Sequence, residues 1–278
     1  MNQCSLIKEI RCTMVYVHVM HNDEFLQKTK VFVDTYHKFP PGIDHISLVV
    51  VNGKPDKETL ALFEPLQRVR VLEHDNTGWD IGAFIAASKI ISTPAAIYFG
   101  NTSFVQRAGW LARMMGAWDK YGPGMYGSFG TYEVCPHMNT SGFLCDPRFL
   151  SQYPHPVFDK PGRYNFEWGH DAMWKRIARE GLPVKMVTWD GEYDWMNWRK
   201  PPNIFRRGDQ SNCVTFFRHS LSYGLADAAG KRHMASLADT LTDPDFNIAV
   251  KSNYSEGSLV RANILPKSRG PGFGENKK

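Results

Sequence analysis

Residues 75–84 read DNTGWDIGAF, and this stretch decides the fold expected for the whole chain. A short apolar run precedes it at residues 69–72, and apolar side chains recur at helical spacing after Gly78. A second apolar run follows at residues 95–100 and ends in the polar turn 101–103. The order is therefore strand, glycine-containing turn, helix, strand and polar turn.

The polar side chains of this stretch are expected to meet at one edge of a sheet. Turns at the carboxyl ends of strands form the ligand-binding crevice of open α/β sheets. The polar residues that would gather there are Asp75, Asn76, Asp80 and Asn101. The sequence therefore predicts a ligand-binding edge.

The segments that precede this stretch alternate in the same way. Nearly continuous apolar runs at residues 12–20 and 45–51 are typical of buried parallel strands. Residues 24–38 have a helical pattern, Asp56 can cap a short helix, and residues 68–73 supply a third strand. Strands and helices that alternate at this spacing indicate a mostly parallel sheet with helices on both faces.

The remaining chain continues the alternation less regularly. We expect a loop at residues 154–164, helices at residues 109–121 and 167–180, and strands at residues 125–129, 142–145, 184–188 and 214–218. Residues 221–241 look helical, with interruptions at Gly224 and Gly230, and the polar residues after them indicate a flexible tail. We therefore expect a catalytic domain at residues 1–220 and a helical C-terminal extension at residues 221–278.

Composition and charge narrow the class of protein. The net charge of +5 and the pI of about 8.9 suit an anionic ligand or partner, such as a nucleotide or nucleic acid. The 5 cysteines contain no CxxC pair and are expected to be reduced, which predicts a cytoplasmic location. No apolar run approaches the ~20 residues that span a bilayer, so no transmembrane segment is expected. GxGxxG and Walker A sequences are absent, which argues against a dinucleotide-binding fold and a P-loop kinase.

The order of elements, together with residues 76–84, resembles the GT-A-fold glycosyltransferases. The resemblance is greatest to the family 2-like and rhamnan-synthesis-type branches, which carry an Asn-x-Gly-x-Asp-Ile-Gly element near the fourth strand. It covers residues 12–188 by order of elements and residues 76–84 in detail. It implies an α/β fold with a GT-A-like, Rossmann-related, mostly parallel central sheet. It also implies a nucleotide-sugar donor, such as a UDP-, GDP- or dTDP-sugar.

The same resemblance implies where the donor binds. Asn22 and the turn 52–56 would lie near the base and ribose, and residues of the 75–84 stretch would border the pocket. The donor-binding residues expected on this basis are Asn22, Asp56, Asp75, Asn76, Gly78, Asp80, Asn101, Ser103, Arg206 and Arg207.

A divalent metal is the cofactor that the resemblance implies, and here the sequence departs from the family. Such enzymes hold Mg²⁺ or Mn²⁺ on the diphosphate with an acidic DxD motif after the fourth strand, where residues 101–103 of this chain read NTS. Neutral amides and hydroxyls bind these ions more weakly than carboxylates do. Either the metal is absent and cations such as Arg206 neutralise the leaving diphosphate, or Asp80, Asp171 or His219 supplies a ligand.

Candidates for the catalytic base lie close together in the sequence. Inverting glycosyl transfer needs a carboxylate that takes the proton of the acceptor hydroxyl as its oxygen attacks the anomeric carbon. Asp171 resembles the acidic residue that family 2 enzymes use, and Glu167 and His170 are the alternatives. An acid at the start of a helix also stabilises the helix dipole without a catalytic role, and this interpretation of Asp171 stays open.

Aromatic residues late in the chain are candidates for the acceptor site. Trp189, Tyr193 and Trp195 lie in a segment dense in aromatic and acidic residues and could stack on a sugar or an extruded base. Core packing is the alternative explanation for at least two aromatic residues of that segment. His137 belongs to residues 136–143, which resemble the acceptor side of the same enzymes.

The sequence thus predicts a glycosyltransferase, either a hexosyl- or a pentosyltransferase. It would move a sugar with inversion to a hydroxyl group of a glycan or lipid-linked acceptor. Two alternatives stay open. The acceptor could be a hydroxylated base in DNA, which the basic charge and the aromatic cluster permit. The domain could also be an inactive one that binds carbohydrate or nucleic acid, and the missing acidic triplet is the main support for that alternative.

Overall fold

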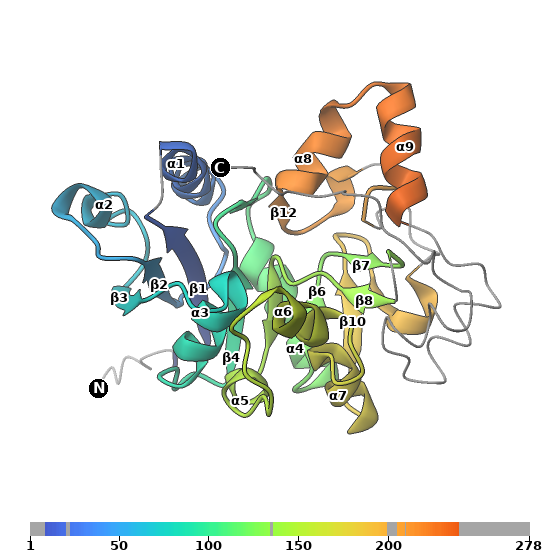
Figure 1. The fold of residues 1–278 in the computed structure, drawn as a ribbon, viewed down its shortest axis with the longest axis horizontal. Coiled ribbons are helices and arrows are strands. Elements are labelled where there is room, and N and C mark those ends of the chain that lie inside the picture. The colour runs from blue at the N-terminus through green and yellow to red at the C-terminus, as the bar shows by residue number, and fades with distance from the viewer. Residues whose placement is uncertain (1–8, 21–22, 134–135, 199–204, 209, 239–278) are drawn as a thin grey trace, which may run out of the picture.

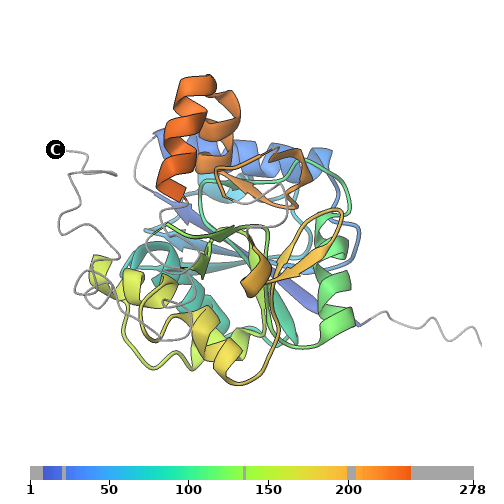
Figure 2. The same ribbon diagram turned by 90° about the vertical axis from the view of Figure 1, so that its right-hand side faces the viewer.

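The computed structural model describes residues 9–20, 23–133, 136–198, 205–208 and 210–238. The predicted donor residue Asn22 and the predicted tail lie outside these ranges. Figure 1 shows a central sheet with helices on both faces, and Figure 2 shows the same layers from the side. The expected α/β class, with a mostly parallel central sheet flanked by helices, is confirmed.

Eight strands form the central sheet, in the order β11-β10-β6-β9-β4-β1-β2-β3. Their bounds are β1 Cys12–Val19, β2 Ile46–Asn52, β3 Val69–His74, β4 Ala95–Phe99, β6 Met125–Gly127, β9 Phe143–Cys145, β10 Val184–Val187 and β11 Glu192–Asp194. Strands β1 to β4 run parallel, as do β6 and β10, whereas β9 and β11 are antiparallel to their neighbours. The carboxyl ends of β1 to β4 therefore share one edge, here called the carboxyl edge.

Helices cover both faces of the sheet. Their bounds are α1 Asp23–Lys38, α2 Lys57–Ala61, α3 Trp79–Ser88, α4 Trp110–Tyr121, α5 Pro147–Ser151, α6 Lys160–Glu167, α7 Met173–Arg179, α8 Arg218–Leu225 and α9 Ala228–Ala238. Buried side chains of α1 and α4 pack on one face, and those of α3, α5, α6 and α7 pack on the other. No helix within the described ranges is long and apolar enough to cross a bilayer.

Each central strand buries side chains on both faces. In β1, Val15 and Val17 join the cluster on the α3 face, whereas Met14 and Tyr16 join the cluster on the α1 face. The ring of Tyr16 stacks on Phe32 of α1, with centroids 4.0 Å apart. Burial on both faces explains why these strands read as continuous apolar runs rather than as alternating ones.

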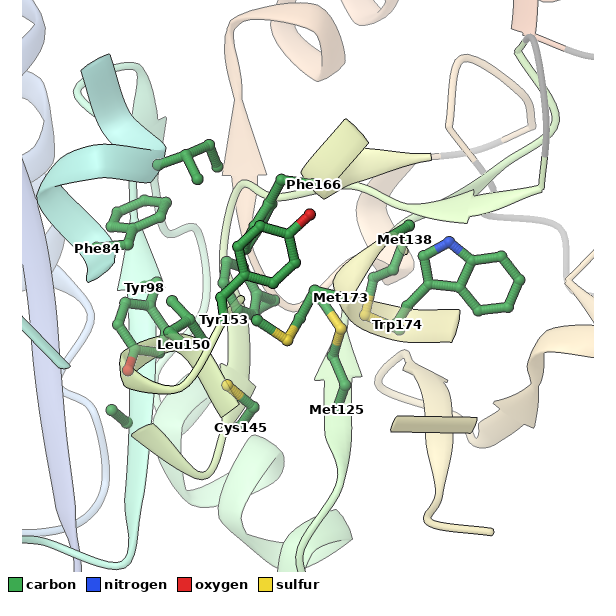
Figure 3. Close-up of a cluster of buried hydrophobic side chains, with 14 of the residues drawn as sticks. Phe84, Tyr98, Met125, Met138, Cys145, Leu150, Tyr153, Phe166, Met173 and Trp174 are labelled. Carbon is green, nitrogen blue, oxygen red and sulfur yellow. The ribbon is translucent and has the colours of Figure 1, made fainter. Parts of the chain in front are cut away.

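The cluster on the α3 face is shown in Figure 3. Phe84 of α3 lies 5.3 Å from Tyr98 of β4 between ring centroids, and Tyr98 stacks on Phe143 of β9 at 5.0 Å. Leu150 and Met173 bring α5 and α7 into the same cluster. These contacts fix α3 against the middle of the sheet, which determines where the first turn of α3 lies.

A third apolar cluster lies at the carboxyl edge. Two small strand pairs complete the fold, β5 Ser103–Phe104 with β12 Phe216–Phe217 and β7 Gly130–Thr131 with β8 His137–Met138. The cluster joins β5 and β12 to Phe129, the residue before β7, and to Ala238 of α9. Phe104 stacks on Phe216 with ring centroids 5.5 Å apart, and Tyr132 N donates to the carbonyl of Ala238 at 3.2 Å. Residues 221–238 of the predicted extension therefore pack onto the sheet domain, and the domain boundary at residue 220 stays a prediction.

The prediction of a single helix at residues 167–180 is wrong. The chain forms α6 and α7 instead, with a break at residues 168–172, and α6 begins inside the predicted loop. At the break, Trp168 has φ −143° and ψ −2°, Gly169 N donates to the carbonyl of Tyr164 at 3.1 Å, and Ala172 has φ −52° and ψ 142°. These local backbone angles end α6 and delay the start of α7.

The predicted C-terminal helix is also divided, at a different place from the one expected. Gly224 and Gly230 lie inside α8 and α9, and the break falls at residues 226–227. Oδ1 of Asp227 accepts a hydrogen bond from Gly230 N at 2.7 Å, so an aspartate cap starts the second helix. The expected strand at residues 214–218 is reduced to β12, because α8 already begins at Arg218.

The turn between β3 and α3 is tightly packed and carries unusual backbone angles. Asn76, Gly78 and Trp79 have φ values of 68°, 71° and 52°. A Cβ atom on Gly78 would overlap the carbonyl oxygen of Val157, and one on Gly82 would overlap the carbonyl oxygen of Thr77. Glycine is required at both positions for the backbones to approach this closely.

We expect Gly82→Ala to lower the free energy of unfolding by about 1–3 kcal/mol, because the added methyl group has to displace backbone atoms. Gly116→Ala in α4 is the matched control, since a Cβ atom there meets nothing within 4 Å. The control should raise the free energy of unfolding by about 0.5–1 kcal/mol through helix propensity. Urea unfolding followed by circular dichroism measures both, and changes of the same sign would contradict this account.

Candidate active site

Polar side chains line the carboxyl edge where three strands end. Asn52 ends β2, Asn76 follows β3, and Asn101 and Ser103 follow β4. Each has a buried polar atom without a hydrogen bond to any described residue, namely Nδ2 of Asn52, Oδ1 of Asn76 and Asn101, and Oγ of Ser103. Buried polar atoms are nearly always paired in folded proteins. Their concentration at one edge therefore marks a candidate binding site.

The turn after β3 is held by local hydrogen bonds. Oδ1 of Asp75 accepts from Thr77 N at 2.9 Å, which lowers the pKa of the exposed Asp75 carboxyl. The N–H of Asn76 donates to Nδ1 of His74 at 3.2 Å. Asp75 thus shapes the turn, whereas Asn76 presents an unpaired amide oxygen.

Asp80 lies in the first turn of α3, beside the end of β4. Its Oδ2 would be 2.6 Å from a Cβ atom on Gly100, so the carboxylate can approach only because Gly100 has no side chain. Asp80 makes no hydrogen bond or ion pair with any residue in the described ranges. Burial raises its pKa, against the opposing charges of Arg163 and Arg218. Asp80 is therefore a desolvated acid without a partner among the residues that the structure describes.

Helix α6 brings a second carboxylate to the same place. Oε1 of Glu167 accepts from Oγ1 of Thr140 at 2.7 Å and from Nη2 of Arg163 at 3.4 Å. Thr140 belongs to the loop that enters β9 at the carboxyl edge, and the charge of Glu167 acts on Asp80. Its side chain is 15% exposed, and Oε2 has no hydrogen bond to a described residue. One oxygen is thus positioned by the protein while the other is available.

Arginines lie in the same region as these two acids, and Arg163 bonds directly to Glu167. Arg163, Arg206 and Arg218 all act on His219, whose pKa burial and these charges lower to about 3. We call Arg163, Arg206 and Arg218 the arginine cluster. The charges of Arg163 and Arg218 also act on Asp80, which connects this cluster to the acids. Nδ1 of His219 lies 3.2 Å from Nη2 of Arg206, so a neutral imidazole faces the guanidinium. Several cations around an unpaired acid form a site suited to an anionic ligand.

Asp171 lies in a different environment from Glu167. It does not open a helix, because Ala172 is the N-cap of α7. Its carboxylate bonds to Nη2 of Arg179 at 2.9 Å and Nε2 of His155 at 2.9 Å, and it also lies 3.2 Å from His170. Arg179 and His155 lower the pKa of Asp171 to about 2. Such a strongly ion-paired carboxylate is a weak proton acceptor.

The predicted aromatic residues of the acceptor site do not form one wall. Trp189 packs with the cluster on the α1 face, with the guanidinium of Arg107 4.3 Å from its ring centroid. Trp195 packs with Trp174 on the opposite face, at 5.6 Å between centroids. Tyr193 is on the same face as Trp195. Each is half-buried and packs against a core cluster, so their separation argues against a shared stacking surface.

Other predicted residues are dispersed. Asp56 caps α2 by accepting from Thr59 N at 2.7 Å. His137 is half-buried in β8, where it pairs with Thr131 of β7. Arg207 is exposed beside the buried Arg206.

The residues after β4 do not fit a divalent metal. Nδ2 of Asn101 donates to Oγ1 of Thr29 at 3.0 Å, so this side chain is turned toward α1. Of the proposed ligands, Asp171 is ion-paired elsewhere and His219 faces the arginine cluster. No group of three or more His, Cys, Asp and Glu side chains in the described residues is arranged to hold a metal ion. The metal therefore stays a prediction without a fitting set of ligands.

Sequence reasoning does not single out Arg163, Arg218 or Thr140 as members of the site. Arg163 and Glu167 are one helical turn apart, which is an available signal, but Arg163 falls in a predicted loop. Thr140 lies within residues 136–143, which resemble the acceptor side of the GT-A enzymes, whereas Arg218 carries no pattern in the sequence that indicates its role. They join the site only because β9 and β12 bring distant segments to the carboxyl edge.

The chain has loose structural similarity to solved structures. HddC from Yersinia pseudotuberculosis has a TM-score of 0.40 and 11% identity over 51% of this chain and 80% of that one. S. aureus TarS 1-349 in complex with UDP has a TM-score of 0.42 and 9% identity over 55% of this chain and 53% of that one. Mouse xyloside xylosyltransferase 1 in its apo form has a TM-score of 0.41 and 12% identity over 62% of this chain and 81% of that one.

The chain thus spans about half of the TarS fragment. No protein-family model and no curated protein matches the sequence. Similarity at this level indicates neither a substrate nor an activity for this chain.

The contrasting surroundings of Asp80 and Asp171 predict opposite effects of removing their charges. A raised folded-state pKa means that ionisation of Asp80 opposes folding as the pH rises above about 4. Asp80→Asn should therefore raise the free energy of unfolding at pH 7 by about 1–2 kcal/mol.

A pKa of about 2 means that Asp171 stabilises the fold above pH ~4 and that this contribution is lost as the pH falls toward 2. Asp171→Asn should cost about 1 kcal/mol at pH 7.

Urea unfolding at pH 7 and pH 3 measures both effects. The gain from Asp80→Asn should disappear at pH 3, where wild-type Asp80 is protonated. A destabilised Asp80→Asn variant at pH 7 would show that Asp80 has a stabilising partner and is not an unpaired acid.

Proposed function

We propose that this chain is a glycosyltransferase that moves a sugar, with inversion, from a nucleotide-sugar donor to a hydroxyl acceptor. The observation that carries the proposal is the unpartnered Asp80 next to Glu167 and the arginine cluster at the carboxyl edge. The resemblance of residues 76–84 to the family 2-like and rhamnan-synthesis-type enzymes supports it independently. The donor would lie across the ends of β1 to β4.

On the donor side, Asp80 accepts hydrogen bonds from hydroxyl groups of the donor sugar or ribose. A ligand hydroxyl would supply the partner that this carboxylate lacks among the described residues, and it would offset the cost of desolvation. The unpaired Nδ2 of Asn52 and Oδ1 of Asn76 are one donor and one acceptor at the same edge. They suit the polar edges of the nucleoside.

In the chemical step, Glu167 acts as the general base. As the acceptor oxygen attacks the anomeric carbon, Glu167 takes its proton and the bond between that carbon and the diphosphate oxygen breaks on the opposite side. Thr140 and Arg163 hold Oε1, which leaves Oε2 for the proton. This assigns the role to Glu167 rather than to Asp171, because the ion pairs of Asp171 reduce its basicity.

The arginine cluster neutralises the leaving diphosphate. Guanidinium groups form paired hydrogen bonds to phosphate oxygens and stay charged at all physiological pH values. Arg218 makes no ion pair with a described residue, so its charge is available to a ligand.

No step is assigned to a metal ion, because the residues after β4 do not fit one. We place the enzyme in the cytoplasm, where the buried free thiols of Cys12 and Cys145 suit a reducing compartment.

Binding of a nucleotide sugar is the first test. In a thermal-shift screen of UDP-, GDP- and dTDP-sugars, at least one should raise the melting temperature, since a ligand that binds only the native state stabilises it. The shift and the turnover should persist in EDTA.

Arg218→Met, which removes an exposed charge, should weaken donor binding by about tenfold or more. Absence of any shift with every donor would contradict the proposed function and favour the inactive binding domain.

Substitution of each carboxylate by its amide distinguishes the two candidate bases. Glu167→Gln keeps an acceptor for Thr140 but removes the base, so kcat should fall by about 10²–10⁴-fold while donor affinity changes little. Asp171→Asn should keep kcat within about threefold, with the loss of stability described above. Steady-state turnover with the donor found by thermal shift measures both. The reverse pattern would assign the base to Asp171.

A further inference from the structure

A groove of about 630 Å³ lies between α1, β5 and α8, on the side of the sheet that α1 covers. Val31 and Phe39 line it from α1 and the residue after it, Phe104 from β5, and Leu221 from α8. Val31 and Leu221 are each 48% exposed, which is unusual for aliphatic side chains that share one hollow. Phe104, which lines the groove, is held in place by stacking on Phe216.

The rim of this groove is positively charged. Glu24 pairs with Lys28 one helical turn away, so these two charges offset each other. Lys38 and Arg218 also line the groove, and neither forms an ion pair with a residue in the described ranges. The groove therefore combines an apolar wall with unpaired cations at its edge. This combination is complementary to a molecule that has a hydrocarbon chain next to an anionic group.

The groove and the candidate active site share two residues. Arg218 lines the groove, and its charge also acts on Asp80. Ser103, whose buried Oγ lacks a partner among the described residues, lines the groove next to Phe104. The groove therefore lies next to the site proposed for the donor.

We propose that the groove binds the hydrocarbon chain of a lipid-linked acceptor whose phosphate group lies at Lys38, the rim cation that the donor site does not use. This inference rests on the proposed function, because it assigns the acceptor of the same transfer reaction. The accessible surface of the groove is mostly apolar, although Gln27, Thr35 and Gln106 also line it. A peptide would need a partner for every backbone N–H and C=O group that it buries. A single chain of methylene groups needs no such partners and gains affinity with each group that it buries.

Binding of alkyl phosphates of increasing length tests the proposal. Isothermal titration of the full chain with butyl, hexyl, octyl and decyl phosphate, each below its micellar concentration, should show affinity rising about fourfold per methylene. Val31→Asp, at an exposed position, should weaken the binding of decyl phosphate by about tenfold or more. Ile90→Asp is the matched control, because Ile90 is 57% exposed after α3, on the opposite face, and should bind as the wild type does.

Three results would overturn the proposal. One is an affinity that does not depend on chain length, and another is an equal loss in the Val31→Asp and Ile90→Asp variants. The third is a wild-type dimer that Val31→Asp converts to a monomer in sedimentation, with no chain-length dependence, since the groove would then bind a second copy of the chain. Failure of the proposed function is separate, because it is measured by the donor thermal shift on the same preparation.

Discussion

The close approach of backbones at Gly78 and Gly82 is the constraint on which the candidate site depends. Gly78 leaves room for the carbonyl of Val157, and Gly82 leaves room for the carbonyl of the preceding turn. This packing sets the first turn of α3 against the end of β4, so that Asp80 meets the bare backbone of Gly100. It also fixes the loop that leads into α6, whose Glu167 is the second acid of the site. The two carboxylates are therefore positioned by one contact between segments about 80 residues apart.

The electrostatics of the site are organised for a ligand rather than for the empty protein. Asp80 is desolvated and has no partner among the described residues, which raises its pKa and works against folding. Arginines close enough to act on it make no direct bond to it, and Arg218 makes no ion pair within the described ranges. A protein selected only for stability would pair these charges. Unpaired charge in a defined geometry is the usual mark of a site that acts on a substrate.

Local patterns in the sequence were sufficient to predict most strands of the sheet, but they did not predict all the helices and loops that pack around it. The strands β1 to β4 and the helices α1, α3 and α4 were predictable because apolar runs and periodicity depend on burial, which neighbouring residues already encode. The break between α6 and α7 is not part of the prediction, although it is local, because Gly169 contacts Asn165 only four residues away. The same break separates Asp171 from Glu167. A family resemblance favoured the former as the base, whereas the observed hydrogen bonds favour the latter.

The sequence by itself determined the alternation of strands and helices, the mostly parallel sheet, and the edge at which Asn76, Asp80 and Asn101 lie. These follow from hydrophobic periodicity and from the rule that parallel strands end together. Only the tertiary structure decided which charged groups meet there. Thr140, Arg163 and Arg218 reach the site from three separate segments, and no local pattern predicts contacts over such distances along the chain. The partners, the burial and the pKa of a carboxylate all depend on the residues that surround it in the folded chain. The role of each acid therefore depends on the fold rather than on its residue type.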